Sequence, residues 1–117
     1  MTTTNEQCTA AAPDLATRGP RPMDATLDGY AWLPRMIDKA RAARAGTIGD
    51  FIYPCPIDRA CLTGLRLDAA TFADVASGLA RDDAILAELR RLGIPRATDA
   101  WFDAIALEQT LHRGVDP

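Results

Sequence analysis

The chain has 117 residues, a length that suits one domain and leaves little room for two. Hydrophobic residues make up 48% and charged residues 25% of it, which is the balance of an ordinary globular protein with a single core. The formal net charge of -3 argues against a nucleic-acid binder, because such proteins usually present a basic face.

Export and membrane insertion are not expected from this sequence. No apolar run approaches the roughly 18 to 20 residues that cross a bilayer. The polar N-terminus lacks the charged-then-apolar order of a signal peptide. The three cysteines, Cys8, Cys55 and Cys61, are an odd number without a paired spacing, so we expect neither a disulfide framework nor a metal site. A reducing, cytoplasmic location without a cofactor is therefore expected.

The first half of the chain is predicted to hold an arm, one helix and an irregular loop. Residues 1–22 carry Thr, Ala, Pro and Gly without periodicity, which predicts a flexible arm ahead of a single helical domain over 23–117. A helix is predicted over 34–45, because Pro34 suits a first helical turn and apolar residues then recur at helical spacing. Two glycines and two prolines in residues 46–56 indicate an irregular connector.

The second half is predicted to hold four further helices. They are expected over 56–65, from Asp68 to about 77, from Asp82 to 92, and from 98 or 99 to about 113. Asp68 and Asp82 are expected to cap their helices. The apolar side of the last helix is expected to consist of Trp101, Phe102, Ile105 and Ala106. The expected fold is therefore all-α, a compact bundle of about five helices with one irregular loop. A two-stranded addition near residues 51–53 is compatible with it.

Polar and reactive side chains are dense between Asp28 and Asp58. Arg35, Asp38 and Lys39 are spaced i, i+3 and i+4, so they are expected on one face of the first helix. Arg35 and Lys39 are like charges four residues apart, which is mildly destabilising by itself. An acidic partner is therefore expected beside them, either an aspartate of this stretch or an anionic ligand.

The segment LDGYAWLPRMIDKARAARAGTIGDFIYPCPIDRACL, residues 27–62, resembles the signature of a bacterial family of domains of unknown function, number five thousand and sixty-nine in its series. The matching positions are Gly29, Tyr30, Leu33, Pro34, Arg35, Asp38, Lys39, Arg41, Gly46, Gly49, Tyr53, Pro54 and Asp58. The resemblance implies a small helical fold and a bacterial origin, and it brings no assigned activity. Because the signature is rich in Arg, Asp, Lys and Tyr, it favours a functional site over a solvated helix face.

The first hypothesis is a small cofactor-independent enzyme. It would perform acid–base chemistry, such as isomerisation, elimination or cyclisation, on a small anionic or carbonyl-containing metabolite. Carboxylates can act as general acid or base, a tyrosine can donate to an oxyanion, and Arg and Lys can hold a carboxylate or phosphate. The expected catalytic residues are Asp38, Lys39, Tyr53 and Asp58, and the expected ligand-binding residues are Asp28, Tyr30, Trp32, Arg35 and Arg41.

Two alternatives stay open at the level of sequence. One is a non-catalytic module that binds a small anionic metabolite or a protein partner through the same charges on an open surface. The other is a purely structural charge network, pairing Arg35 with Asp58 and Lys39 with Asp28 around no cavity. A small-molecule ligand is the expected partner, and neither nucleic acid nor membrane is. An amphipathic last helix is also compatible with a homodimer.

Overall fold

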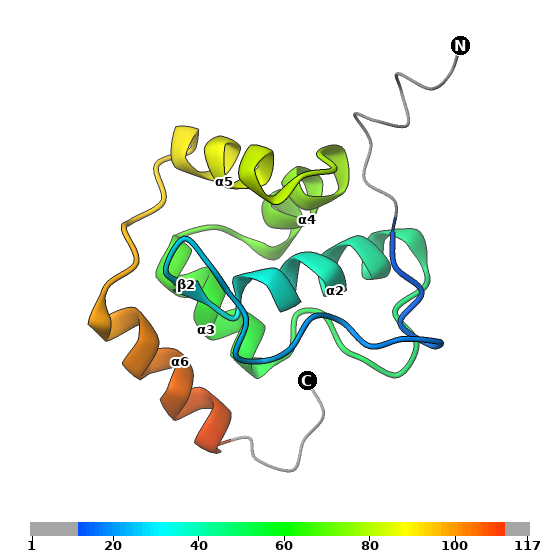
Figure 1. Cartoon of the computed structure of the whole chain (residues 1–117), viewed down its shortest axis with the longest axis horizontal. Helices are drawn as coiled ribbons and strands as arrows, with labels where there is room; N and C mark the ends of the chain where they lie inside the picture. Colours follow the sequence, from blue (N-terminus) through cyan, green and yellow to red (C-terminus); the bar gives the residue numbers. More distant parts are fainter. Residues whose placement is uncertain (1–11, 112–117) are drawn as a thin grey trace.

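Five helices and one short antiparallel hairpin make up residues 12–111, the part of the chain that the computed structural model describes (Figure 1). The elements are β1 Thr26–Leu27, β2 Tyr30–Ala31, α2 Leu33–Ala45, α3 Pro56–Leu65, α4 Ala69–Gly78, α5 Asp82–Arg91 and α6 Asp99–Leu111. The predicted mostly helical, compact fold is confirmed. The predicted end of the last helix near 113 lies outside the described residues. None of the described helices combines the length and the apolarity needed to span a bilayer.

Helix α2 occupies the middle of the molecule (Figure 1). It packs against α4, and α4 carries α5 on the same side, while α3 packs against α6. Eight residues of α2 are buried, including the charged Arg35 and Lys39. Gly46 ends the helix in the left-handed conformation at φ 78° and donates its N–H to the carbonyls of Ala42 and Ala43. Because α2 is covered on several sides, its polar side chains must find partners inside the protein.

The small sheet lies at residues 26–31, ahead of α2, and residues 51–53 form no strand. Thr26 pairs with Ala31 and Leu27 with Tyr30, so Asp28 and Gly29 are the two turn residues. Both have positive φ, 49° and 87°, which is the backbone that an Asp-Gly hairpin turn favours. The hairpin lets the chain reverse directly before α2 begins.

Residues 12–22 of the predicted arm lie against the domain. Leu15 is buried, its N–H donates to the carbonyl of Thr47 at 2.9 Å, and the Thr47 hydroxyl donates to the carbonyl of Pro13 at 2.7 Å. A side chain at Gly49 would meet the backbone of Ala16 at 3.2 Å. This part of the arm is therefore attached to the loop that follows α2. Residues 1–11, with Cys8, lie outside the described residues.

Helix α6 closes the core through two of its four predicted apolar residues. Trp101 and Ile105 are buried, and the Trp101 ring meets Tyr30 edge-on with 5.4 Å between ring centroids. The Trp101 indole also donates to the carbonyl of Ala31 at 3.2 Å. Phe102, in contrast, is 41% exposed and Ala106 is exposed as well, so their predicted inward positions are wrong. A residue next to Trp101 is turned by about 100° around the helix and cannot face the same neighbours.

A glycine sets how closely α3 and α6 approach. A Cβ on Gly64 would lie 2.5 Å from the Trp101 ring. We therefore expect Gly64→Ala to lower the free energy of unfolding by about 1–3 kcal/mol, through overpacking. Gly78→Ala is the matched control, because that helical glycine has nothing within 4 Å and should gain up to about 1 kcal/mol from helix propensity. Urea denaturation of both variants measures the difference, and an equal effect at the two glycines would contradict the steric argument.

Candidate functional site

A buried ion pair joins the middle of α2 to the start of α3. The Lys39 Nζ lies 2.7 Å from the Asp58 Oδ2, and both side chains have no exposed surface. Asp58 accepts two further hydrogen bonds, from the Trp32 indole at 2.8 Å and from the Cys55 N–H at 3.0 Å. The Lys39 ammonium also lies 5.8 Å from the centroid of the Trp32 ring. A buried carboxylate with three donors is well satisfied, which is the condition for tolerating the pair away from water.

The local sequence explains how Asp58 reaches this position. Cys55 is the N-cap of α3, and its sulfur accepts the Asp58 N–H at 3.4 Å while the Asp58 carboxylate accepts the Cys55 N–H. This reciprocal arrangement is a capping box in which a cysteine takes the usual place of serine or threonine. Pro56 provides the first helical turn. The negative carboxylate also lies at the positive end of the helix dipole.

Arg35 holds the loop after α2 and the N-terminal segment together. Its guanidinium carbon lies 5.5 Å from the ring centroids of both Trp32 and Phe51. Its Nη1 donates to the carbonyl of Arg21 at 3.1 Å. The side chain is only 7% exposed, so the charge is placed between two aromatic rings rather than in solvent.

Asp38 is bound by an arginine that lies in the predicted arm. It accepts hydrogen bonds from the Arg21 N–H at 2.8 Å, from Nε at 3.1 Å and from Nη2 at 3.2 Å. Arg21 also contacts Asp82 at the first residue of α5. Asp82 was predicted to cap α5, but the N-cap is Arg81 and no side chain caps it. The Asp82 carboxylate turns to Arg21 instead.

Arg41 satisfies the end of α4. Its Nε donates to the carbonyl of Ala76 at 2.8 Å, and its Nη2 donates to those of Leu79 at 2.7 Å and Ala80 at 3.1 Å. The last carbonyls of a helix have no partner within the helix, so a guanidinium is a fitting one. Arg41 therefore connects α2 to α4 without an ion pair among the described residues.

The remaining predicted site residues lie apart from this group. Tyr53 donates its hydroxyl to the carbonyl of Ala69 at 2.8 Å. Tyr30 donates to the carbonyl of Pro95, and Asp28 forms an exposed ion pair with Arg90. The specific pairs of the structural network, Arg35 with Asp58 and Lys39 with Asp28, are therefore wrong. Helical spacing cannot choose between several aspartates that are distant in sequence.

Three of the cavities lined by described residues are larger than 400 Å³. The first, of about 700 Å³, lies between the hairpin turn and the start of α6 and includes Asp28 and Tyr30. The second, of about 530 Å³, includes Asp38 and Arg41. The third, of about 420 Å³, lies between α3 and α6. The buried residues Arg35, Lys39 and Asp58 line none of these three. The structure thus divides the predicted site between a buried group and two separate surfaces.

The second cavity gathers four arginines, and we call it the arginine cavity. Its lining is Arg18, Arg21, Asp38, Arg41, Ala80, Arg81, Asp82 and Asp83. Arg21 is shared between two aspartates, and Arg81 pairs with Asp83. Sequence reasoning missed Arg18 and Arg21, because they lie in a segment without periodicity that was predicted to be a flexible arm. No local pattern marks a residue whose partners are 17 and 61 positions away.

The two described cysteines are unsuited to nucleophilic chemistry. Both are free and buried. Burial, followed by the nearby charge of Asp58, raises the pKa of the Cys55 and Cys61 thiols, so the reactive thiolate is disfavoured. Within residues 12–111, no three His, Cys, Asp or Glu side chains are grouped in a way that could hold a metal ion.

The chain belongs to the family described as Domain of unknown function (DUF5069), whose sequence profile matches residues 17–110. The match begins at the N-terminal segment that carries Arg18 and Arg21 and extends through nearly all of α6. The predicted family is therefore confirmed, over a longer stretch than the signature at 27–62. A comparison with curated proteins finds no match.

Disrupting the buried pair of Lys39 and Asp58 should lower the free energy of unfolding more than disrupting an exposed pair does. Asp58→Asn leaves the Lys39 ammonium buried without its counter-charge, and we expect a loss of about 3–5 kcal/mol in the free energy of unfolding. The double variant Asp58→Asn/Lys39→Met should lose less free energy of unfolding than the sum of the losses in the two single variants, because the two residues are coupled. Asp74→Asn is the matched control, since its pair with Arg44 is exposed and is worth about 1 kcal/mol or less. Additive losses in a double-mutant cycle would contradict the coupling.

Tyr53 makes stability depend on alkaline pH. Burial, and then the charge of Asp58, raises the pKa of the Tyr53 phenol above its ordinary value of 10.0. The folded chain therefore keeps a proton that the unfolded chain loses, so the stabilisation is complete below pH 10 and decreases as the pH rises further. Urea denaturation between about pH 8 and 11 tests this. At pH 8 the free energy of unfolding of Tyr53→Phe should be lower than that of the wild type, because a hydrogen bond is lost. As the pH rises, it should decrease less steeply than in the wild type. Parallel pH profiles would show that another group causes the decline.

Proposed function

We propose that the chain is a non-catalytic binding module that takes a small carboxylate or phosphate metabolite of the cytoplasm in the arginine cavity. The observation that carries this proposal is the convergence of four guanidinium groups on one cavity from three parts of the chain. Arg18 and Arg21 come from the N-terminal segment, Arg41 comes from α2, and Arg81 directly precedes α5.

The charges in the cavity are not evenly matched. Arg21 and Arg81 are paired with aspartates, whereas Arg41 binds only carbonyl oxygens. Arg18 is exposed and makes no ion pair with any other described residue. These two arginines therefore keep positive charge that a ligand could neutralise. A guanidinium presents a planar fork of donors that suits the oxygens of a carboxylate or phosphate.

Binding is supported better than acid–base catalysis. Lys39 and Asp58 are without exposed surface, so a substrate would reach them only if the core opened. The Asp38 carboxylate is occupied by Arg21, and the Tyr53 hydroxyl donates to a backbone carbonyl. The groups suited to isomerisation, elimination or cyclisation thus already have partners within the protein.

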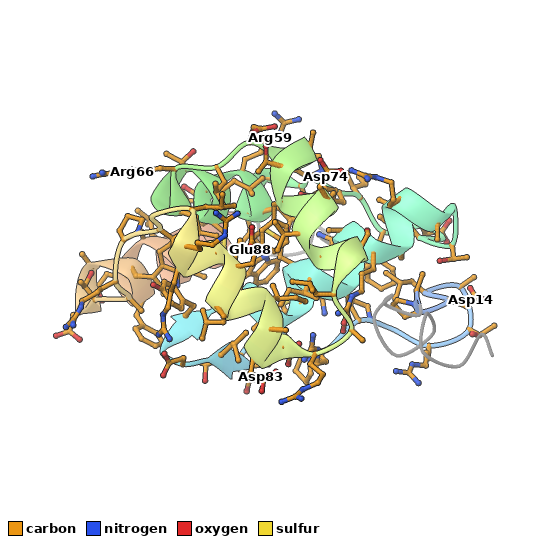
Figure 2. All side chains as sticks on the ribbon, turned by 90° about the horizontal axis from the view of Figure 1, so that it is seen from above. Asp14, Arg59, Arg66, Asp74, Asp83 and Glu88 are labelled. Carbon is orange, nitrogen blue, oxygen red and sulfur yellow. The ribbon has the colours of Figure 1, made fainter. Side chains whose placement is uncertain are left out.

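Isothermal titration calorimetry tests the proposal. The ligands are citrate and inorganic phosphate, and sodium chloride holds the ionic strength constant. We expect Arg18→Ala to weaken the binding of at least one of the two anions by about tenfold, which corresponds to about 1.4 kcal/mol. The fold should be unaffected, because Arg18 is exposed. Arg59→Ala is the matched control, since Arg59 is an exposed arginine on α3 outside the cavity and projects into solvent (Figure 2).

Two outcomes would overturn the proposal. One is that neither citrate nor phosphate binds to the wild-type chain. The other is an equal loss of affinity in Arg18→Ala and Arg59→Ala, because that would indicate unspecific attraction to surface arginines rather than a site.

A further inference from the structure

Residues 12–22 lie on the surface of the helical domain with little burial of their own. The segment contains no helix or strand, and Leu15 is its only buried side chain. Its turn is held from within, because the Asp14 carbonyl accepts the N–H groups of Thr17 and Arg18 at 3.2 and 3.1 Å. A segment with few buried apolar side chains separates from its domain at a smaller free energy than that of global unfolding. The helices can therefore stay folded when this segment leaves them.

The segment is held to the domain at two places. At the first, beside the loop that follows α2, the Leu15 N–H donates to a loop carbonyl at 2.9 Å (Figure 1). At the second, the Arg21 guanidinium lies between two carboxylates, Asp38 of α2 and Asp82 at the start of α5. Residues 16–19, between the two places, are all exposed. The attachment of the segment therefore depends strongly on one charged side chain.

The attachment through Arg21 is ionic and accessible to water. Arg21 donates to Asp38 from Nε at 3.1 Å and from Nη2 at 3.2 Å, and its Nη2 donates to Asp82 at 3.2 Å. The side chains of Arg21 and Asp82 are 34% and 33% exposed. Water can replace bonds of this kind, so breaking them costs much less than breaking the fully buried pair of Lys39 and Asp58. The attachment is therefore reversible without loss of the core.

The position of the segment sets the sign of the charge in the arginine cavity. With the segment in place, four arginines and three aspartates line the cavity, so one positive charge is in excess. Arg18 and Arg21 leave with the segment, whereas Arg41 and Arg81 belong to the domain and remain. Two arginines then face the same three aspartates, and one negative charge is in excess. An anion is therefore attracted by the closed form and repelled by the open one.

We propose that residues 12–22 are a clasp that closes the arginine cavity, with Arg21 as its latch, and that an anion in the cavity holds the clasp closed. The second half of this inference rests on the function proposed above. A ligand that binds only one of two conformations shifts the equilibrium toward that conformation. By linkage, a change that opens the clasp also weakens the binding of the anion.

Amide hydrogen exchange of the full chain, followed residue by residue by NMR spectroscopy, tests the clasp. The reporter is the protection factor of the Leu15 amide, the ratio of its exchange rate in an unstructured chain to the rate observed. In the wild type we expect it to be at least about tenfold lower than that of Ala40, a buried residue of α2, because the clasp opens while the core stays folded.

Two variants of the latch and one control separate the clasp from general destabilisation. Arg21→Ala should lower the Leu15 protection factor at least about tenfold, and Asp82→Asn should lower it by a smaller factor because Asp38 still binds the guanidinium. Arg90→Ala is the matched control, since its ion pair with Asp28 does not involve the clasp and is the same in both forms. It should leave the Leu15 protection factor unchanged. Circular dichroism should show native helix content in all three variants.

The anion tests the second half of the inference. Citrate or phosphate, at ten times the dissociation constant found by calorimetry, should raise the Leu15 protection factor of the wild type about tenfold. Sodium chloride at the same ionic strength is the control and should not raise it. Arg21→Ala should also bind the anion more weakly than the wild type does. An anion that binds but leaves the exchange of Leu15 unchanged would show that the cavity does not need the clasp.

Two results count against the clasp itself. One is a Leu15 protection factor as high as that of Ala40 in the wild type, because the segment would then leave only when the whole domain unfolds. The other is an equal Leu15 protection factor in the wild type and in Arg21→Ala. If neither anion binds, the proposed function fails alone, and the comparison of Arg21→Ala with Arg90→Ala still decides whether the clasp exists.

Discussion

The fold depends on one buried ion pair, between Lys39 on α2 and Asp58 on α3. Removing an ammonium and a carboxylate from water costs several kcal/mol each, so the pair is tolerated only when every other demand on it is met. Trp32 and Cys55 supply the remaining donors to Asp58, and the Trp32 ring lies near the Lys39 charge. The start of α2, the middle of α2 and the start of α3 must therefore all be in place together.

Three other charged side chains of α2 also contact partners outside the helix. Arg35 reaches the loop after α2 and the N-terminal segment, Asp38 reaches Arg21, and Arg41 reaches the end of α4. A central helix that is covered on several sides cannot leave such groups unbonded, because an unsatisfied buried charge is among the largest penalties in a fold. The polar signature of the family is thus largely a set of contacts that hold the surrounding segments to α2.

This changes where function is to be sought. A signature of Arg, Asp, Lys and Tyr resembles a catalytic site at the level of sequence. In the structure, however, most of these side chains already form hydrogen bonds or ion pairs with other parts of the protein. The surfaces that stay open to partners lie at its edges. The arginine cavity combines two signature residues, Asp38 and Arg41, with Arg18 and Arg21 of the N-terminal segment and with residues 80–83 at the start of α5.

The sequence by itself determined the helices, the position of the irregular loop and the family. Caps, prolines, glycines and apolar spacing act within a few residues, so α3, for example, begins and ends where its sequence predicts. Only the tertiary structure decided the partners. Asp58 was chosen over Asp28 for Lys39, Arg21 was drawn from an aperiodic segment, and Phe102 was left outside while Trp101 was buried. These outcomes depend on which distant segments meet α2 and α6, and no spacing along the chain encodes that.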